Sequence, residues 1–137
     1  MDPRNAIRQA AACTAFLLAA AAAVLQAHHS LTGIYDQDVT ASVDGRIREF
    51  HFVNPHPYVT VTVEEKDGAA AEWRLDMDNR HELVAIGMTE RTLMPGDRIV
   101  ATGMRGRDEK TRLYIRRLDR PADGFWYEQV GASPRMR

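Results

Sequence analysis

Residues 58–78 read YVTVTVEEKDGAAAEWRLDMD, and this stretch decides the fold class. Its valines alternate with polar residues, which is the period of a half-buried strand. Asp67-Gly68 then gives a hairpin-turn signal. A second alternation follows, with Trp73, Leu75 and Met77 on one face. The stretch therefore predicts two antiparallel strands joined by a tight turn.

Strand patterns continue on both sides of this hairpin. Residues 39–53 predict a long strand, in which Ile47 and Phe50 have opposite parity, so that a bulge is needed between them. Residues 98–104 and 112–118 predict two more strands, joined by a charged loop. These patterns predict an antiparallel, mainly β domain.

The period changes once, between the third and fourth of these strands. Leu83, Val84 and Ile86 lie on one face of a short predicted helix, with Asn79 as its N-cap and Gly87 at its C-terminal stop. The order of elements predicts an all-β fold with small α content: an OB-like five-stranded Greek-key barrel with a helix between strands three and four.

The N-terminus has the three parts of an export signal. Two arginines give it a basic start, residues 10–25 are alanine-rich and almost wholly apolar, and polar sequence begins after Ala27. The apolar run is short for a membrane span, which needs about 20 strongly apolar residues. We expect residues 1–27 to be a signal peptide and residues 28–137 a single periplasmic or secreted domain, with no stable membrane insertion after cleavage. An uncleaved anchor, or a cut a few residues away, is the alternative.

Composition argues against two functional classes. The chain has 18 Lys and Arg residues against 19 Asp and Glu residues, so it lacks the basic excess typical of nucleic-acid binding. Its one cysteine, Cys13, falls inside the predicted signal, so the mature domain has no disulfide and no thiolate nucleophile or ligand. Histidine is then the available transition-metal ligand, with carboxylates as helpers.

His28 and His29 directly follow the expected cleavage site. Cleavage there makes His28 the first residue, with a terminal amine whose ordinary pKa is about 8. Amine and ring nitrogens of one residue form a chelate that suits copper(II). His29 offers a competing mode through the intervening amide nitrogen. The alternative is a polar, unstructured terminus.

His56 is the strongest internal candidate for a metal ligand. Pro55 and Pro57 fix the backbone on both sides of it, so holding its ring in place costs little entropy. The alternative is an ordinary turn residue. We expect His51 on the solvent side of its strand and His81 on the surface of the predicted helix.

Enzymatic chemistry has weak support. Asp36, Asp76 and Asp78 are candidate helper carboxylates, but nothing in the sequence brings them together. We expect Asp76 to face solvent, because Leu75 and Met77 on either side of it face inward. The sequence contains no nucleophile elbow, phosphate loop or H-E-x-x-H motif. We therefore assign no catalytic residue and no organic cofactor site.

Several short motifs are spread along the chain. They are AHHS at residues 27–30, NPH at residues 54–56, WRLD at residues 73–76, LMPGD at residues 93–97, and Asp123-Gly124. In this combination the chain resembles a family of small exported bacterial proteins that is grouped as a domain of unknown function. In that family Ala-His-His-Ser marks the mature start, and Asn-Pro-His ends a strand.

The chain departs from that family at three positions. Leu31 and Met88 stand where the family usually has an aromatic residue, and Asp76 stands where it usually has glutamate. The resemblance implies an exported small barrel. It draws attention to the three candidate histidines, and it names no ligand.

These observations lead to a first hypothesis, a periplasmic metal-binding carrier or accessory protein with copper as the expected metal. His28 would supply amine and ring, His56 a second ring, and His29 an alternative or outer ligand. The protein's partner would be the metal ion or another cell-envelope protein.

Two other hypotheses stay open. One is a non-metal ligand-binding or peptide-binding OB-like module of the cell envelope, using Thr60, Thr62, Arg74 and the loop at residues 105–110. The other is a copper oxygenase or small hydrolase. An enzyme is disfavoured, because a small chain with few aromatic residues offers little substrate surface.

Overall fold

The computed structural model describes residues 31–130 and 133–137 of the chain. The chain divides into two units, Met1–Ile34 and Tyr35–Arg137. Of the first unit only residues 31–34 are described, and they are helical. The predicted signal peptide lies outside the described residues. Among the helices that are described, none has the length and apolar character needed to cross a membrane.

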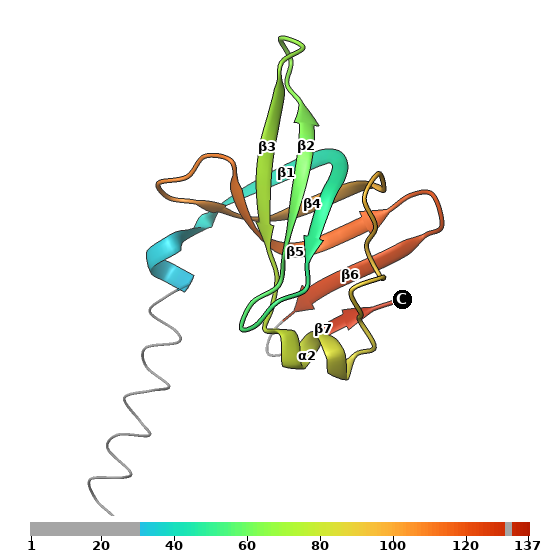
Figure 1. Ribbon diagram of the computed structural model, residues 1–137. Helices are drawn as coiled ribbons and strands as arrows, with labels where there is room; N and C mark the ends of the chain where they lie inside the picture. Colours follow the sequence, from blue (N-terminus) through green and yellow to red (C-terminus); the bar gives the residue numbers. More distant parts are fainter. Residues whose placement is uncertain (1–30, 131–132) are drawn as a thin grey trace, which may run out of the picture. The chain divides into compact units, whose positions relative to one another are not determined.

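The second unit is built almost entirely from β-strands (Figure 1). In chain order its elements are β1 (Tyr35–His51), β2 (Tyr58–Glu64), β3 (Ala70–Asp76), α2 (Arg80–Ala85), β4 (Arg98–Gly106), β5 (Arg112–Arg120), β6 (Phe125–Val130) and β7 (Ser133–Met136). They form one sheet in the order β3-β2-β1-β4-β5-β6-β7. The prediction of an all-β fold with small helical content is confirmed.

The sheet bends so that its strands pair in a closed path. β1 pairs antiparallel with β2 along its second half and with β4 along its first half. β2 pairs with β3, and β5 pairs antiparallel with β4. The first residues of β5 also pair in parallel with the end of β3. Following these ladders from β1 through β2, β3, β5 and β4 leads back to β1.

Local details in β1 and α2 follow the sequence signals. The β1–β2 register shifts between Ile47 and Glu49, which is the predicted bulge. The Asn79 side chain accepts a hydrogen bond from the Glu82 amide at 3.0 Å, which confirms it as the N-cap. Gly87 ends the helix region with a φ of 93°, a backbone conformation that favours glycine.

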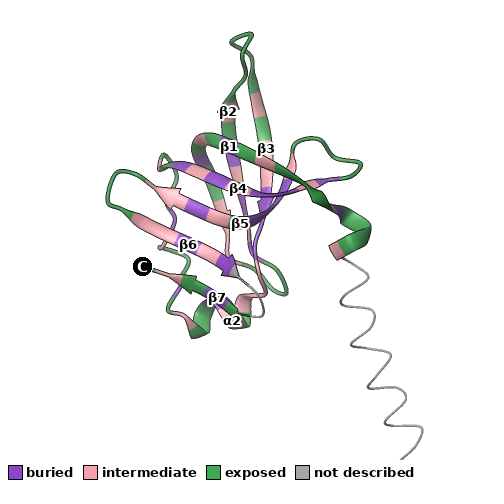
Figure 2. Cartoon of the chain, turned by 180° about the vertical axis from the view of Figure 1, so that it is seen from behind, coloured by how far each residue is buried: buried purple, intermediate pink, exposed green. Residues whose placement is uncertain are grey.

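Buried residues lie on most strands of this path, as the purple segments in Figure 2 show, and they form the core. Four of the residues predicted to face inward on the hairpin belong to it, together with Leu83 from α2 and Tyr127 from β6: Val59, Val61, Leu75 and Met77. The other two, Val63 and Trp73, are partly buried and pack against it. Val84 is 48% exposed, so its predicted place on the inner face of the helix is wrong. Successive residues of a helix point about 100° apart, so Val84 turns away from the core that Leu83 faces.

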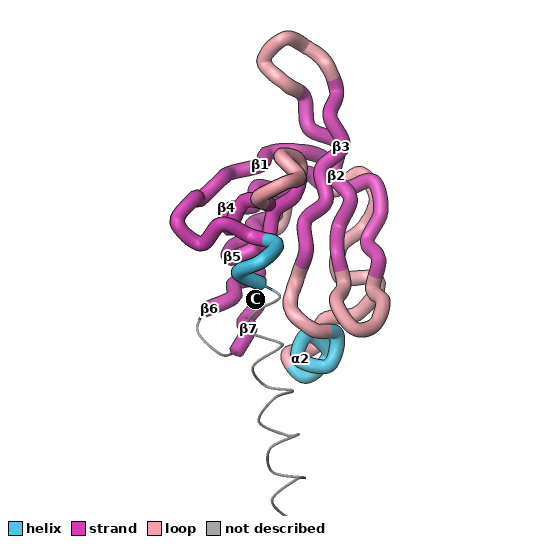
Figure 3. Tube along the Cα trace, turned by 90° about the vertical axis from the view of Figure 1, so that its left-hand side faces the viewer, coloured by secondary structure: helices cyan, strands magenta, loops and turns pink. Residues whose placement is uncertain are grey.

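Two parts of the architecture differ from the prediction. β6 and β7 add two strands beyond β5, whereas only five strands were predicted (Figure 3). β1 also begins at Tyr35, before the predicted start of the first strand. The tip of the β2–β3 hairpin projects away from the neighbouring strands, as Figures 1 and 3 both show.

Candidate functional site

The loop between β1 and β2 carries His56 and is fixed to the segment that leads into α2. The Pro55 carbonyl accepts a hydrogen bond from the Arg80 amide at 2.9 Å, and the Pro57 carbonyl accepts one from the Met77 amide at 3.0 Å. His56 lies between these two anchors and is exposed. Its backbone is thus held on both sides while its imidazole remains accessible.

Arg80 holds the same loop at its other end. Its Nε donates to the Phe52 carbonyl at 3.2 Å, and its guanidinium carbon lies 4.8 Å from the centroid of the Phe52 ring. Phe52 packs against the core. The His56 loop is therefore fastened to packed structure at three points, which lowers the entropy that a ligand side chain would lose on binding.

The other predicted metal ligands are not brought together by the described structure. His28 and His29 lie outside the described residues. Within residues 31–130 and 133–137, no group of three or more His, Cys, Asp or Glu side chains is placed to hold a metal ion. His81 is exposed on α2.

His51 is half-buried, which differs from the expected solvated position. Its ring stacks on Tyr58, with centroids 4.2 Å apart and planes 16° apart. The Arg74 guanidinium carbon lies 3.8 Å from the centroid of the same Tyr58 ring. Two groups this close to one ring centre must occupy its opposite faces. His51, Tyr58 and Arg74 therefore form a three-layer stack on the outer side of β1, β2 and β3.

Asp76 lies beside Arg74, at the end of this stack. Its position is the main difference from the sequence-based prediction. It is 5% exposed, although we expected it to face solvent. Arg74 donates to its Oδ1 at 2.9 Å, and Arg112 donates to its Oδ2 at 2.7 Å. The Tyr35 hydroxyl donates a short hydrogen bond to the same Oδ2. Asp76 does point away from the core, but Tyr35 and Arg112 cover that side of β3.

The charges of this network set the protonation of its members. Burial alone would raise the pKa of Asp76, but hydrogen bonds from Arg74, Tyr35 and Arg112 outweigh it and lower the pKa below the ordinary 3.8. Burial and the neighbouring carboxylate raise the pKa of the Tyr35 hydroxyl. Both oxygens of the Asp76 carboxylate thus accept hydrogen bonds within the protein. The side chain is therefore not free to act as a base or a metal ligand.

The lowered pKa of Asp76 predicts a loss of stability in acid. A group whose pKa is lower in the folded state stabilises the fold above its unfolded pKa and loses that contribution as pH falls through the folded value. We expect the difference in unfolding free energy between the wild type and Asp76→Asn to be constant at neutral pH and to shrink below about pH 4. Urea unfolding across this range measures it. A difference that grows in acid would contradict the assignment.

The other two candidate carboxylates serve local roles. Asp36 lies 3.6 Å from Arg107 in a partly exposed ion pair. Asp78 accepts from the Asn79 amide at 3.1 Å beside the start of α2. Burial and the nearby Asp78 raise the pKa of Glu82. Neither Asp36 nor Asp78 shares a site with Asp76, so the described structure does not bring the three candidate helper carboxylates together.

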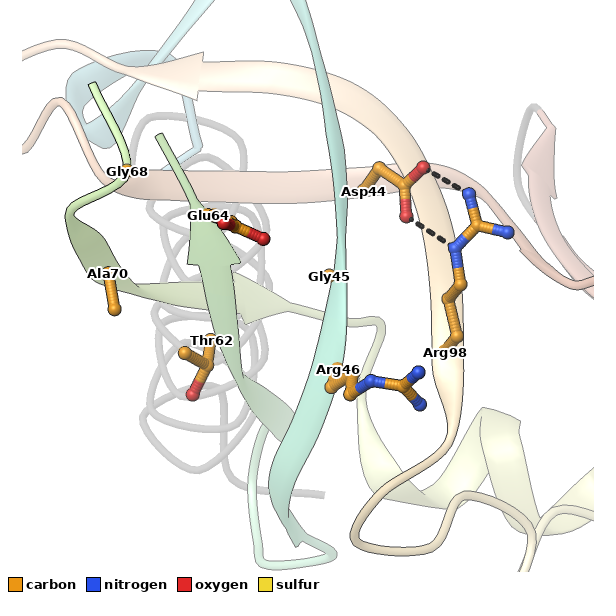
Figure 4. Close-up of a pocket in the computed structure, with 8 residues that line it drawn as sticks. All are labelled: Asp44, Gly45, Arg46, Thr62, Glu64, Gly68, Ala70 and Arg98. Atoms are coloured by element: carbon orange, nitrogen blue, oxygen red, sulfur yellow. Dashed lines mark hydrogen bonds and ion pairs between the residues drawn. The ribbon is translucent and has the colours of Figure 1, made fainter. Parts of the chain in front are cut away.

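A hollow of about 490 Å³ opens where β1 and the β2–β3 hairpin separate (Figure 4). Its walls carry the side chains of Arg46, Thr62 and Glu64 and the ion pair of Asp44 with Arg98, and small residues complete its lining: Gly45, Gly68 and Ala70. In the close-up, Glu64 and Thr62 lie on the β2 side of β1, and the Asp44–Arg98 pair lies on the other side. Thr62 was predicted to belong to a binding surface, whereas the hollow itself has no signal in the sequence.

Comparison with known protein families gives a match over most of the chain. The model of DUF6152, a family of unknown function, matches residues 15–114. This range includes β1 to β4 and the first residues of β5, so β6, β7 and the Asp123-Gly124 turn lie beyond it. No curated protein and no solved structure matches the chain.

Proposed function

The chain belongs to DUF6152, a family of unknown function, and we propose that it is an exported metal-binding protein, with copper(II) as the metal. It would act in the periplasm or outside the cell as a carrier or accessory protein. The proposed ligands are the terminal amine and ring of His28, the ring of His56, and His29 as an alternative or outer ligand. The export signal predicted for residues 1–27 supports the location.

The observation that carries this proposal is the setting of His56. Its side chain is exposed, whereas main-chain hydrogen bonds from the Arg80 and Met77 amides fix the residues on both sides of it. An imidazole on a rigid loop is partly preorganised as a ligand, so binding costs less entropy there than on a free chain. Neutral imidazole is a suitable donor for copper(II).

We further propose that the domain is an OB-like barrel. Three observations support this. The strand path through β1, β2, β3, β5 and β4 returns to β1, β3 and β5 pair in parallel, and α2 lies between β3 and β4. OB-like barrels use outer faces and loops for binding, and the His56 loop occupies such a position.

The proposal predicts copper binding that depends on two histidines far apart in the sequence, His28 and His56. We expect calorimetric titration of the protein purified from the exported fraction to show one copper(II) site. His28→Ala and His56→Ala should each weaken it at least about tenfold, because losing even a residue that only supports a metal ligand typically costs about 10- to 100-fold in affinity. An added N-terminal extension should weaken it similarly, because it removes the free amine.

His81→Ala is the matched control, because it removes an exposed histidine outside the proposed ligand set. The copper affinity of His81→Ala should equal that of the wild type. Equal copper affinity in the wild type, His28→Ala and His56→Ala would contradict the proposal.

The open hollow beside β1 favours one second candidate, a non-metal binding module of the cell envelope. The hollow offers a carboxylate at Glu64 and a guanidinium at Arg46 on adjacent strands. Binding there should survive an N-terminal extension, whereas the copper site should not. The two functions are thus separable by one variant.

A further inference from the structure

Two carboxylates lie close together where β3 leads into α2. Asp78 follows the last residue of β3 by two positions, and Glu82 belongs to the first turn of α2. Both are half-buried. Burial and the nearby Asp78 raise the pKa of Glu82 above its ordinary value. Two like charges held together away from bulk water repel each other, so this pair calls for a positive partner.

No lysine or arginine of the described residues forms an ion pair with either carboxylate. Arg80, which begins α2, donates from Nε to the Phe52 carbonyl at 3.2 Å. Arg116 lies over the ring of Tyr114, with its guanidinium carbon 5.9 Å from the ring centroid. His81 is exposed, and histidine is positive only when it is protonated. The described residues thus supply the pair with no permanent positive charge.

Two tyrosine hydroxyls lie near the same carboxylates. Tyr114 belongs to the part of β5 that pairs with the end of β3, opposite Asp76. Tyr127 of β6 pairs with Met136 of β7, the strand that lies against α2. Burial raises the pKa of both hydroxyls, and the charge of Asp78 is the next cause for each. The cluster therefore combines two carboxylates with two phenol oxygens.

Two buried oxygens of this cluster have no hydrogen-bond partner. Tyr127 is 0% exposed, yet its hydroxyl forms no hydrogen bond within the part of the chain that is described. The Oδ2 atom of Asp78 is also buried and has no partner there, whereas its Oδ1 accepts from the Asn79 amide at 3.1 Å. Buried polar atoms in folded proteins almost always have a partner. These two oxygens therefore indicate a bound group that contacts both.

We propose that Asp78, Glu82 and the two tyrosine hydroxyls bind a hard divalent cation, with calcium as the best fit. All the donor atoms are oxygens, which are the ligands that such cations take. Calcium accepts about six to eight oxygens in flexible geometry, including waters, whereas magnesium demands a near-ideal octahedron. Oxygens from a loop, a helix and two strands form an irregular set, so they suit calcium better.

This site is separate from the proposed copper site. It contains no imidazole, and it has only two carboxylates, so it is not one of the groups of three His, Cys, Asp or Glu side chains that were sought above. Carboxylate oxygens suit calcium, whereas imidazole suits copper. The inference does not depend on the copper proposal, and His56→Ala should leave the calcium affinity unchanged.

Thermal unfolding of the exported protein, treated first with a chelator, tests the site. We expect a dissociation constant of about 0.1–1 mM, the range of weak extracellular calcium sites. Calcium chloride at about 10 mM should then raise the unfolding midpoint by at least about 5 °C over sodium chloride of equal ionic strength. Magnesium chloride should raise it less. No rise with calcium overturns the proposal.

Glu82→Gln separates binding from folding. Glutamine keeps the size of the side chain and removes one of two like charges, so the calcium-free variant should unfold at or above the wild-type midpoint. Calcium binding should weaken at least about tenfold, because losing even a residue that only supports a metal ligand typically costs about 10- to 100-fold. The calcium-induced rise should fall below half of the wild-type value. An equal rise in the variant and the wild type overturns the proposal.

Glu90→Gln is the matched control. Glu90 is an exposed carboxylate in the segment between α2 and β4, and the substitution makes the same chemical change outside the cluster. The wild-type response to calcium should persist in this variant. If Glu90→Gln loses as much of the response as Glu82→Gln does, calcium acts on the surface charge in general and the site is refuted.

Discussion

Asp76→Asn should lower the unfolding free energy by about 3 kcal/mol, the cost of removing one partner from a buried ion pair. Asparagine keeps the shape of the side chain but leaves the guanidinium of Arg112, which is 20% exposed, without its carboxylate. Its amide also turns donor hydrogens toward the donors of Arg74 or Tyr35. Urea unfolding at pH 7 measures the loss.

Asp119→Asn is the matched control for this prediction. Asp119 also forms a close pair with an arginine, Arg117 at 2.6 Å, but its side chain is 43% exposed. Exposed pairs contribute little because water screens them, so the change should stay within about 0.5 kcal/mol. Similar small losses in both variants would mean that burial does not increase the contribution of the Asp76 network to the free energy of unfolding.

Local sequence patterns account for most of the fold. Alternation located the β2–β3 hairpin, parity located the bulge near Ile47, and capping chemistry located Asn79 at the start of α2. Each of these signals acts within a few residues. β6 and β7 were missed because residues 125–136 show no clear alternation, and their strands form by pairing with β5 and with each other.

The Asp76 network was missed for a related reason. Parity correctly placed Asp76 on the face of β3 opposite Leu75, but it cannot tell what covers that face. Tyr35 and Arg112 do so, and they stand 41 and 36 positions away in the sequence. Contacts at that separation leave no local signal. His51 and Tyr58 are closer in sequence, and an aromatic pair flanking a predicted turn could have suggested their stacking.

The exposed His56 was predictable because its constraint is local, through the prolines on either side. The Arg80 and Met77 amides that hold its loop were not, because they depend on how β3 leads into α2. Sequence thus identified the candidate ligand, and the structure supplies the reason why its backbone is rigid. The proposed partners of His56 at residues 28 and 29 still rest on sequence alone.

Gly103→Ala should cost about 3 kcal/mol or more, because β4 and β5 approach too closely there for any side chain. A Cβ at Gly103 would lie 1.9 Å from the carbonyl oxygen of Tyr114 and 2.8 Å from its carbonyl carbon. These are backbone atoms of a paired strand, so they cannot move aside as a flexible side chain would. The strands must separate at the bulge between Thr102 and Gly103.

That separation should also disturb the Asp76 network, because the Tyr114 ring lies 5.5 Å from the Tyr35 ring. We therefore expect Gly103→Ala to change the near-ultraviolet circular dichroism of the tyrosines as well as the urea midpoint. Gly33→Ala is the matched control, since a Cβ there meets nothing within 4 Å, and it should not lower the unfolding free energy, because alanine suits the helical residues 31–34 at least as well as glycine does. If Gly103→Ala unfolds at the wild-type midpoint with an unchanged tyrosine spectrum, the two strands are not in the close contact that closes the path from β3 through β5 to β4.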